Sequence, residues 1–554
     1  MSAQTVPAST AGEAKPFPLP ASNSAVWPLL AIGLLLIMQL SMVFTRAVNW
    51  DEFWFYYHVA DFARGTLAQP LQSLHVRLFA WLPGLPGSGV EKIQVARVVM
   101  LACEAATLFA IYALARRFVQ RPAAVLAALL YLSAGYVLQH GFSFRTDPMA
   151  TAALMSALAI LGRARLNVLS LAAFALLIAV AGMITIKTAL YAPAFLGLAW
   201  MRWAEDDFAP GTAIRLIAAA LATVALFMAI YVWHASALTQ ATQGTDMAAS
   251  ASRWMFFLGV PEYWEMGVKA VLTAPILFLL AFLTPLAVWR SDLPTPAKLA
   301  LTALWLPLTL PLFYTNSAAY FYVFMLAPVA VSVGITAQIL LDRYPLALVT
   351  GVLAMLAVGA FLLEDRETVE RQQALVEAAE RLLPEGTAYF DHNGMLPSFV
   401  KANNLMTPAG INDYLLRARP YYHEEMERTV VPLLVANDEL IETMLQGGDS
   451  YFLPEDTAAL RDTYINAWGP LWLAGFAFES NAPITREVRV PGQYQVEGSP
   501  LQIDGKIWQP DDTVQLDRGM HTFTAVGNSG RLIWKTEAPL PLGAWDDGQL
   551  YVGF

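Results

Sequence analysis

The chain has 554 residues, of which 57% are hydrophobic and only 14% are charged. Soluble globular proteins average about 45–50% apolar and about 25% charged residues, so this composition excludes a disordered protein and a single water-soluble enzyme. The net charge of −10 is uneven, because residues 1–363 carry 20 Lys and Arg against 15 Asp and Glu, whereas residues 364–554 carry 14 against 29. The sequence therefore predicts a slightly basic membrane part followed by an acidic extramembrane part.

The membrane part begins after a polar segment. Residues 1–26 are rich in Pro, Ala and Ser, which is typical of a disordered tail. The apolar run 27–45 has no charge and no small-residue cleavage site after it, so it predicts a retained first span and not a signal peptide. Counting further apolar runs, we predict eleven spans at 27–45, 98–115, 123–138, 149–161, 166–186, 188–201, 216–238, 270–289, 299–314, 319–341 and 344–363.

The orientation follows from the basic residues, since short cytoplasmic loops collect Lys and Arg. A cytoplasmic N-terminus places ten of them inside: Arg116, Arg117, Arg121, Arg163, Arg165, Arg202, Arg215, Arg290, Lys298 and Arg343. Eleven spans then put the acidic C-terminal part outside. The chain has no Asn-x-Ser/Thr sequon, which favours a bacterial inner membrane over a eukaryotic lumen.

The long first outer loop, residues 47–97, opens with two adjacent carboxylates, Asp51 and Glu52, among aromatic residues. A carboxylate near hydrocarbon loses hydration, so an acidic pair at this depth suggests a function. The alternative is that both acids cap the helix that follows them. Further along, residues 71–83 predict an amphipathic helix on the membrane surface that carries His75 on an apolar background.

Two later outer turns carry isolated charges. Arg145 and Asp147 lie just before the fourth span, where Asp147 and Pro148 fit the N-cap and first turn of a helix. Arg145 has no such explanation, and an arginine beside an apolar surface suits a phosphate group. Lys187 stands alone between two apolar runs, either as a cation beside an anionic ligand or as a side chain that reaches the headgroups.

The predicted topology places all six residues on the outer face: Asp51, Glu52, His75, Arg145, Asp147 and Lys187. Acids and isolated cations at a membrane surface indicate a site for a lipid-linked phosphate and a reaction beside it. A carboxylate can act as general base, and the cations can neutralise a phosphate leaving group.

Other polar residues carry weaker signals. Glu104 predicts a residue of the bundle interior or of the active cavity. The outer loop 239–269 is either a lid over substrate or a surface loop. The only cysteine, Cys103, excludes an intrachain disulfide. The pair Asp51 and Glu52 could hold a divalent cation together with His75, but their spacing requires none, so we assign no metal.

The extramembrane part divides by pattern into two segments. Residues 364–484 begin with an amphipathic helix at 365–382 and contain apolar runs at 387–391 and 430–436, which predicts a small α/β segment. Residues 485–554 show short alternating strands separated by turns such as Asp504-Gly505, which predicts a β-sandwich. The acidic balance argues against nucleic acid or anionic lipid as a partner of this part.

These motifs, taken together, resemble the GT-C glycosyltransferases, in particular the protein O-mannosyltransferases and lipid A aminoarabinose transferases. The pair Asp51-Glu52 matches the family's Asp-Glu pair after the first span, and Lys187 matches its lysine near the fifth span. Arg145 and Asp147 match its second-loop Arg and Asp, and Tyr320-Phe321-Tyr322 its late tyrosine-containing span. Departures are the missing prolines after His75 and Thr188 in place of a glycine. The resemblance covers about residues 27–363.

The resemblance implies an inverting glycosyltransferase that takes a sugar from a polyprenyl-phosphate donor at the outer face and gives it to a lipid, glycan or protein acceptor. It implies that Asp51 is the base or acceptor-orienting carboxylate and that Glu52 supports it. Arg145 and Lys187 would bind the donor phosphate, while Asp147 and His75 would position sugar or acceptor.

Two other functions remain open from the residues alone. A transporter or flippase of lipid-linked sugars would usually show paired repeats with broken helices at the membrane midplane, and no internal repeat is present. A non-enzymatic membrane scaffold that binds glycans through its C-terminal domain leaves Arg145 and the acidic pair without a role.

Overall fold

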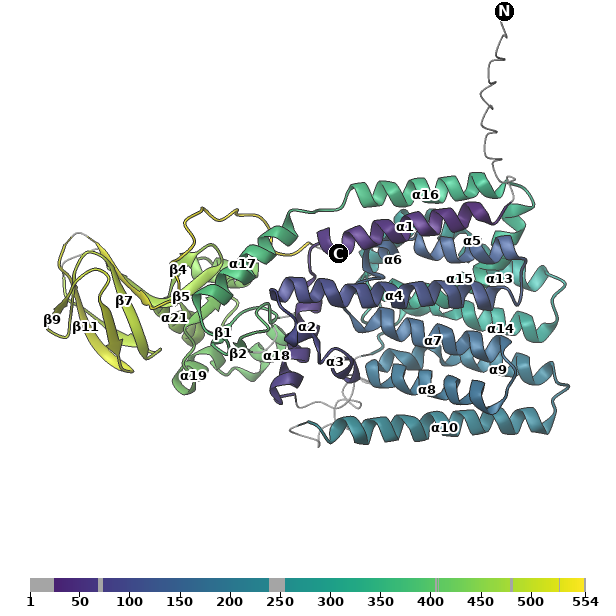
Figure 1. Ribbon diagram of the computed structural model, residues 1–554, viewed down its shortest axis with the longest axis horizontal. Coiled ribbons are helices and arrows are strands. Elements are labelled where there is room, and N and C mark those ends of the chain that lie inside the picture. The colour runs from purple at the N-terminus through teal and green to yellow at the C-terminus, as the bar shows by residue number, and fades with distance from the viewer. Residues whose placement is uncertain are drawn as a thin grey trace, which may run out of the picture.

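The computed structural model describes residues 24–67, 73–238, 255–403, 406, 408–478, 482–527 and 529–552. Most of the predicted N-terminal tail therefore lies outside the described residues. The described chain forms a long bundle of roughly parallel helices, with a mixed domain of helices and strands at one end (Figure 1). This mostly helical part followed by a β-rich region agrees with the predicted fold class.

Helices occupy every predicted span. The bundle consists of α1 (Val26–Thr45), α4 (Gly89–Ala115), α5 (Arg121–Leu132), α6 (Gly135–His140), α7 (Thr146–Arg163), α8 (Val168–Ile184), α9 (Ala192–Ala204), α10 (Pro210–Ala235), α12 (Trp264–Thr273), α13 (Pro275–Arg290), α14 (Thr295–Trp305), α15 (Phe321–Leu341) and α16 (Leu346–Leu362). Two 3₁₀ helices, η2 (Ile186–Tyr191) and η3 (Leu306–Leu312), interrupt it.

Four of the described helices, α1, α4, α10 and α15, are each long and apolar enough to cross a membrane by length and composition. The pair α12 and α13 is bent by 102° and adds a fifth if it counts as one span. The bend falls at Ala274, directly before Pro275, where a helical conformation is sterically disfavoured. The protein is therefore a multi-pass membrane protein, and the number of eleven spans stays a prediction.

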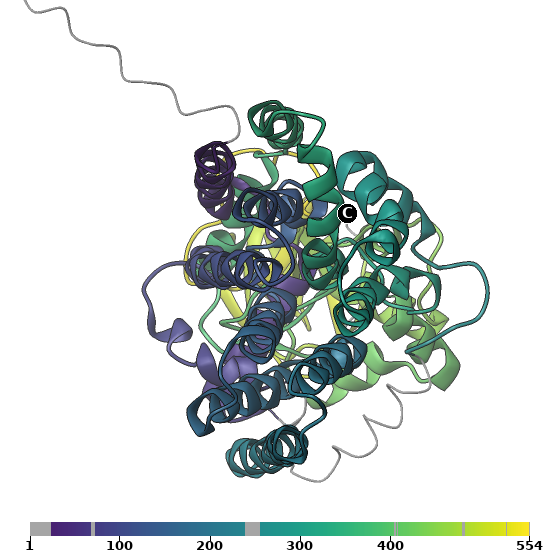
Figure 2. The same ribbon diagram turned by 90° about the vertical axis from the view of Figure 1, so that its right-hand side faces the viewer.

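Helix α15 forms the centre of the bundle, since every residue from Phe321 to Ala337 is buried. Helix α10 lies at the edge, because only Thr212, Ala219 and His234 are buried along its 26 residues. Figure 2 looks along the helices and shows α15 surrounded and α10 outside the ring. The outward apolar side chains of α10 are those that lipid would cover.

The first outer loop contains α2 (Trp50–Arg64), α3 (Leu74–Leu78) and the 3₁₀ turn η1 (Leu82–Gly84). The single amphipathic helix predicted over residues 71–83 is therefore wrong over its described part, and residues 71–72 lie outside that part. Pro83 explains the break, because a proline cannot donate the backbone hydrogen bond that a continuing helix needs.

The C-terminal domain follows α16 through α17 (Thr368–Leu382). Its other helices are α18 (Pro408–Arg417), α19 (Tyr421–Arg428), α20 (Glu439–Leu445) and α21 (Pro454–Thr463). Its strands are β1 (Ala388–Phe390), β2 (Val400–Lys401), β3 (Leu433–Val435), β4 (Tyr464–Trp468), β5 (Leu471–Phe478), β6 (Ile484–Val488), β7 (Gly492–Gly498), β8 (Leu501–Ile503), β9 (Lys506–Trp508), β10 (Thr513–Leu516), β11 (Gly519–Ala525) and β12 (Gly530–Trp534).

The strands form two sheets. The larger has the order β10-β7-β12-β5-β3-β1-β2, with β4 also paired to β5, and the smaller has the order β6-β11-β8-β9. Apolar side chains of both sheets, such as Val496 of β7 and Phe523 of β11, share one core, so the two sheets pack face to face. Because β12 pairs with β5, the larger sheet continues across the division predicted between residues 484 and 485.

Candidate functional site

Four of the six predicted site residues form one continuous chain of ion pairs. Asp51 forms a salt bridge with Arg145, whose Nε lies 3.6 Å from Asp147 Oδ2. Lys187 Nζ then donates a hydrogen bond of 2.7 Å to Asp147 Oδ1. Two carboxylates and two cations therefore alternate within one cluster, at the end of the helical bundle that meets the C-terminal domain (Figure 1).

Three separate segments position these side chains. Asp51 lies in the first turn of α2, where the Asn49 side chain accepts a hydrogen bond from its backbone N–H at 3.0 Å. Arg145 is the N-cap residue of α7 and has an extended backbone, and Lys187 lies on η2. The turns that the topology placed on one face thus meet in space.

The structure does not place Asp147 at the N-cap position that its sequence context suggested. The N-cap position of α7 belongs to Arg145 and carries no side-chain capping bond, whereas Asp147 is already helical and its side chain is only 1% exposed. A buried carboxylate requires compensating charge. Lys187 and Arg145 supply it, so Asp147 holds the two cations together.

Aromatic rings enclose the cations. The Arg145 guanidinium carbon lies 3.3 Å from the centroid of the Tyr320 ring, and Lys187 Nζ lies 5.1 Å from the same centroid. Phe55 covers Arg145 from another direction at 5.6 Å. A cation over an aromatic face is attracted by the ring quadrupole, and more strongly when it is desolvated. Tyr320 therefore belongs to the site, although the sequence showed only its place in a family motif.

Exposure separates the two acids of the cluster. The Asp51 side chain is 21% exposed, while those of Arg145 and Lys187 are 6% and 10% exposed and that of Asp147 is almost completely buried. Asp51 is therefore the carboxylate that an incoming molecule can reach. Tyr263, within the outer loop 239–269, is close enough for Asp51 to contribute to its raised pKa, after burial and Glu262. The loop's residues 239–254 lie outside the described residues.

Glu52 takes a structural position. Its carboxylate accepts hydrogen bonds of 2.8 and 2.6 Å from the buried Arg97 of α4, and others from the backbone N–H groups of Asn49 and Phe144. Burial alone would raise the pKa of the Glu52 carboxyl, but Arg97 and the two backbone donors hold it below its usual value. Both oxygens are thus occupied, and the capping interpretation of the acidic pair holds for Glu52.

His75 lies outside the chain of ion pairs. Its ring packs edge-on against Phe55 with centroids 5.2 Å apart, and neither ring nitrogen has a hydrogen-bond partner within the described part of the chain. Burial lowers the pKa of His75 to about 3, so the ring is neutral. Asp51, Glu52 and His75 are not brought together as ligands, and no group of three such side chains that could hold a metal occurs among the described residues.

Residues of the C-terminal domain form hydrogen bonds with the chain on both sides of Asp51. The Gln372 side chain exchanges two hydrogen bonds of 2.7 Å with the backbone of Val48. The Asn393 side chain donates a hydrogen bond of 2.8 Å to the Trp50 carbonyl, and Tyr57 accepts one of 3.0 Å from the Lys401 backbone N–H. We call these contacts the α2 clamp.

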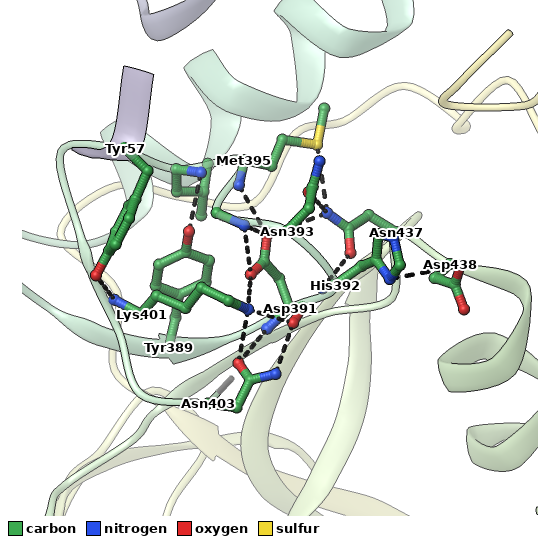
Figure 3. A network of polar contacts seen from close by, with 12 residues as sticks. Tyr57, Tyr389, Asp391, His392, Asn393, Met395, Lys401, Asn403, Asn437 and Asp438 are labelled. Carbon is green, nitrogen blue, oxygen red and sulfur yellow. Dashed lines mark hydrogen bonds and ion pairs between the residues drawn. The ribbon is translucent and has the colours of Figure 1, made fainter. Parts of the chain in front are cut away.

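A buried polar network around Asp391 lies next to the residues of the α2 clamp (Figure 3). Asp391 follows β1 and accepts hydrogen bonds from the backbone N–H groups of Gly394 and Met395 and from Lys401 Nζ. Asn437 follows β3 and donates to Asp391 at 3.2 Å. The parallel strands β1 and β3 end at the same sheet edge, so their following residues meet there. Networks whose members are all bonded are rigid, which fixes Asn393 against α2.

The α2 clamp can be tested by hydrogen exchange. Asn393→Ala should speed amide exchange in peptides covering residues 50–57 about fivefold, because a net hydrogen bond contributes roughly 1 kcal/mol to local stability. Asn466→Ala is the matched control, since Asn466 also donates one side-chain bond to a carbonyl, at 2.7 Å to Gly469 in the same domain. Equal exchange in α2 for both variants would mean that the domain does not hold this helix.

No protein-family model and no curated protein matches this sequence. Solved structures match it across most of its length. The crystal structure of ArnT from Cupriavidus metallidurans bound to undecaprenyl phosphate has a TM-score of 0.52 at 12% identity, and the match covers 77% of this chain and 96% of that one. The same protein in the apo state has a TM-score of 0.52 at 13% identity and covers 81% and 97%.

The apo oligosaccharyltransferase from Archaeoglobus fulgidus matches with a TM-score of 0.51 at 13% identity, covering 88% of this chain and 74% of that one. ArnT and this oligosaccharyltransferase are both GT-C enzymes. Identities this low show a common fold only. The chain has the GT-C membrane fold, which confirms the fold that its motifs predicted.

Proposed function

We propose that this GT-C-fold chain is a membrane glycosyltransferase that moves a hexose or pentose from a polyprenyl-phosphate donor to a lipid, glycan or protein acceptor. The observation that carries the proposal is the alternating chain Asp51–Arg145–Asp147–Lys187, with its reachable acid and its enclosed cations. The undecaprenyl phosphate bound to the ArnT neighbour supports the class of donor.

Arg145 and Lys187 bind the donor phosphate in this proposal. The planar guanidinium of Arg145 can grip two phosphate oxygens, and Lys187 adds a point charge. Arg145 forms a salt bridge with Asp51. The donor phosphate therefore replaces Asp51 at Arg145, while the buried Asp147 keeps both cations in place.

Asp51, once released, acts on the acceptor. It takes the proton of the acceptor hydroxyl as that oxygen attacks the anomeric carbon of the sugar. The bond from this carbon to the phosphate oxygen breaks, its electron pair leaves with the lipid phosphate, and the configuration inverts. Arg145 and Lys187 stabilise the negative charge on the departing phosphate. His75 contributes indirectly, by supporting Phe55 against Arg145.

The proposed topology places this reaction on the outer face of a bacterial inner membrane. Residues 27–363 form the catalytic membrane domain, and the segments 364–484 and 485–554 form its periplasmic part. The arginines at the opposite end of the bundle support a cytoplasmic position for that end. In this arrangement the α2 clamp holds the helix of the proposed base, Asp51, from the periplasmic side of the membrane.

A transfer assay tests the function. The purified protein is incubated with a panel of labelled undecaprenyl-phosphate hexoses and pentoses and with acceptor-containing membrane extract. We expect one donor class to lose its sugar to the extract in a time-dependent way. Failure to release or transfer any sugar, together with failure to bind undecaprenyl phosphate, would contradict the proposal.

A further inference from the structure

A second feature lies at the end of the bundle farthest from the C-terminal domain, the end that faces the viewer in Figure 2. A cavity of about 1060 Å³ opens there between the end of α4, the end of α13 and the end of α15. Pockets for drug-sized ligands typically measure about 300–1,000 Å³, so this cavity can hold a headgroup and part of a chain. It shares no residue with the ion-pair cluster.

Four arginines line the cavity: Arg116, Arg117, Arg290 and Arg343. Arg116 donates to the Val119 carbonyl at 2.6 Å, and Arg117 pairs with Glu205. Within the described residues, Arg290 and Arg343 form no ion pair.

Two acids, Asp292 and Asp342, also line the cavity, so four positive charges face two negative ones and the net formal charge is +2. Charge of this sign beside a membrane attracts an anionic group.

The remaining wall is apolar and accessible from the side. Leu283, Leu286 and Ile339 line the cavity and are 48%, 51% and 44% exposed. They lie on α13 and α15, within helices that belong to the membrane part. A ligand that fits this surface must carry an anionic head for the arginines and a hydrocarbon chain for the leucines.

Arginines are expected at this membrane face for topological reasons alone. That explanation accounts for their number on the face, and it applies equally to Arg165 and Arg215, which do not line the cavity. It does not account for four arginines around one amphipathic cavity. Basic pockets between membrane helices are known sites for anionic lipid headgroups.

We infer that this cavity binds an anionic phospholipid of the leaflet opposite the C-terminal domain, with its phosphate at Arg290 and Arg343 and one acyl chain along Leu283, Leu286 and Ile339. The site is independent of the proposed glycosyl transfer, because it lies at the other end of the bundle. Its occupant stabilises the joint between α13 and α15.

Native mass spectrometry of the full-length protein in detergent tests the site. Phosphatidylglycerol should bind the wild type, and the double variant Arg290→Gln/Arg343→Gln should bind it about 25-fold more weakly, since each cation near an anionic lipid contributes about fivefold. The matched control Arg165→Gln/Arg215→Gln removes the same charge from the same face and should bind like the wild type. Ala287→Trp, which fills the cavity without changing charge, should also weaken binding.

Four outcomes would overturn the inference. First, the control variant Arg165→Gln/Arg215→Gln could lose as much phosphatidylglycerol binding as Arg290→Gln/Arg343→Gln. Second, phosphatidylcholine could bind the wild type as tightly as phosphatidylglycerol does. Third, undecaprenyl phosphate could bind more tightly than phosphatidylglycerol, and fourth, inorganic phosphate could bind as tightly as phosphatidylglycerol. The first two would mean a nonspecific basic face, the third a different lipid, and the fourth a simple anion site. Sugar transfer by the double variant is expected to persist, so failure of this inference leaves the proposed function untouched.

Discussion

Asp51→Asn should lower the rate of sugar transfer about a thousandfold without unfolding the protein. A positioned general base typically contributes roughly 10²- to 10⁴-fold to a rate, and Asp51 is the accessible carboxylate of the cluster. The change keeps the shape of the side chain and removes its ability to take a proton. The turnover number measured with saturating donor, together with the melting temperature in detergent, separates lost chemistry from lost folding.

Asp61→Asn is a closely matched control. Asp61 lies on the same helix, forms an ion pair with Arg64 at 2.9 Å, and is 19% exposed, compared with 21% for Asp51. Within the described part of the chain, Asp61 forms no hydrogen bond or ion pair with the cluster of Asp51, Arg145, Asp147 and Lys187. If the rate of sugar transfer by the Asp51→Asn variant were within about twofold of the rate of the Asp61→Asn variant, the assignment of Asp51 as base would be wrong.

Lys187→Met should lower both the stability of the protein and its binding of the donor. It leaves the buried Asp147 with only the Arg145 contact at 3.6 Å. Removing one partner of a buried ion pair typically costs about 3–5 kcal/mol of unfolding free energy, because the other charge stays buried. We expect a clear drop in the melting temperature and a loss of donor binding.

The double variant Lys187→Met/Asp147→Asn separates the two roles of Lys187. It removes both charges of the pair, so most of the stability should return. Donor binding and transfer should stay lost, because a phosphate ligand is still missing. Wild-type transfer by the double variant would show that Lys187 is only a structural partner of Asp147.

The grouping of distant turns on one common face was the most informative prediction from the sequence. The distribution of basic residues places the turns with Asp51, Arg145 and Lys187 on one face, and the described structure joins their side chains into one cluster. This worked because hydropathy and charge determine which turns share a face, without knowledge of helix packing.

The sequence could not separate the roles of adjacent acids. Asp51 and Glu52 follow one another on α2 and therefore point in different directions, and tertiary contacts decide what each one meets. Glu52 meets Arg97 from α4, 45 residues away in sequence. Asp147 likewise has a good local explanation as an N-cap, which the long-range contact with Lys187 overrides.

Contacts between distant segments escaped prediction for the same reason. Asn393 contacts Trp50 across 343 residues, and the only local signal was a run of polar residues directly after a short apolar strand. Breaks within apolar runs were also missed. The run 123–138 is divided between α5 and α6, and the run 270–289 spans the bend at Ala274. Hydropathy averages over such breaks, because the residues on both sides are equally apolar.

The central claim is that Asp51 and the donor phosphate compete for Arg145. Binding of undecaprenyl phosphate to the wild type and to Asp51→Asn, measured as a dissociation constant in detergent, tests it most directly. Loss of a partly exposed ion pair corresponds to roughly 1 kcal/mol, so Asp51→Asn should bind the lipid phosphate about fivefold more tightly, although it transfers almost no sugar. Unchanged or weaker binding by Asp51→Asn would contradict the account.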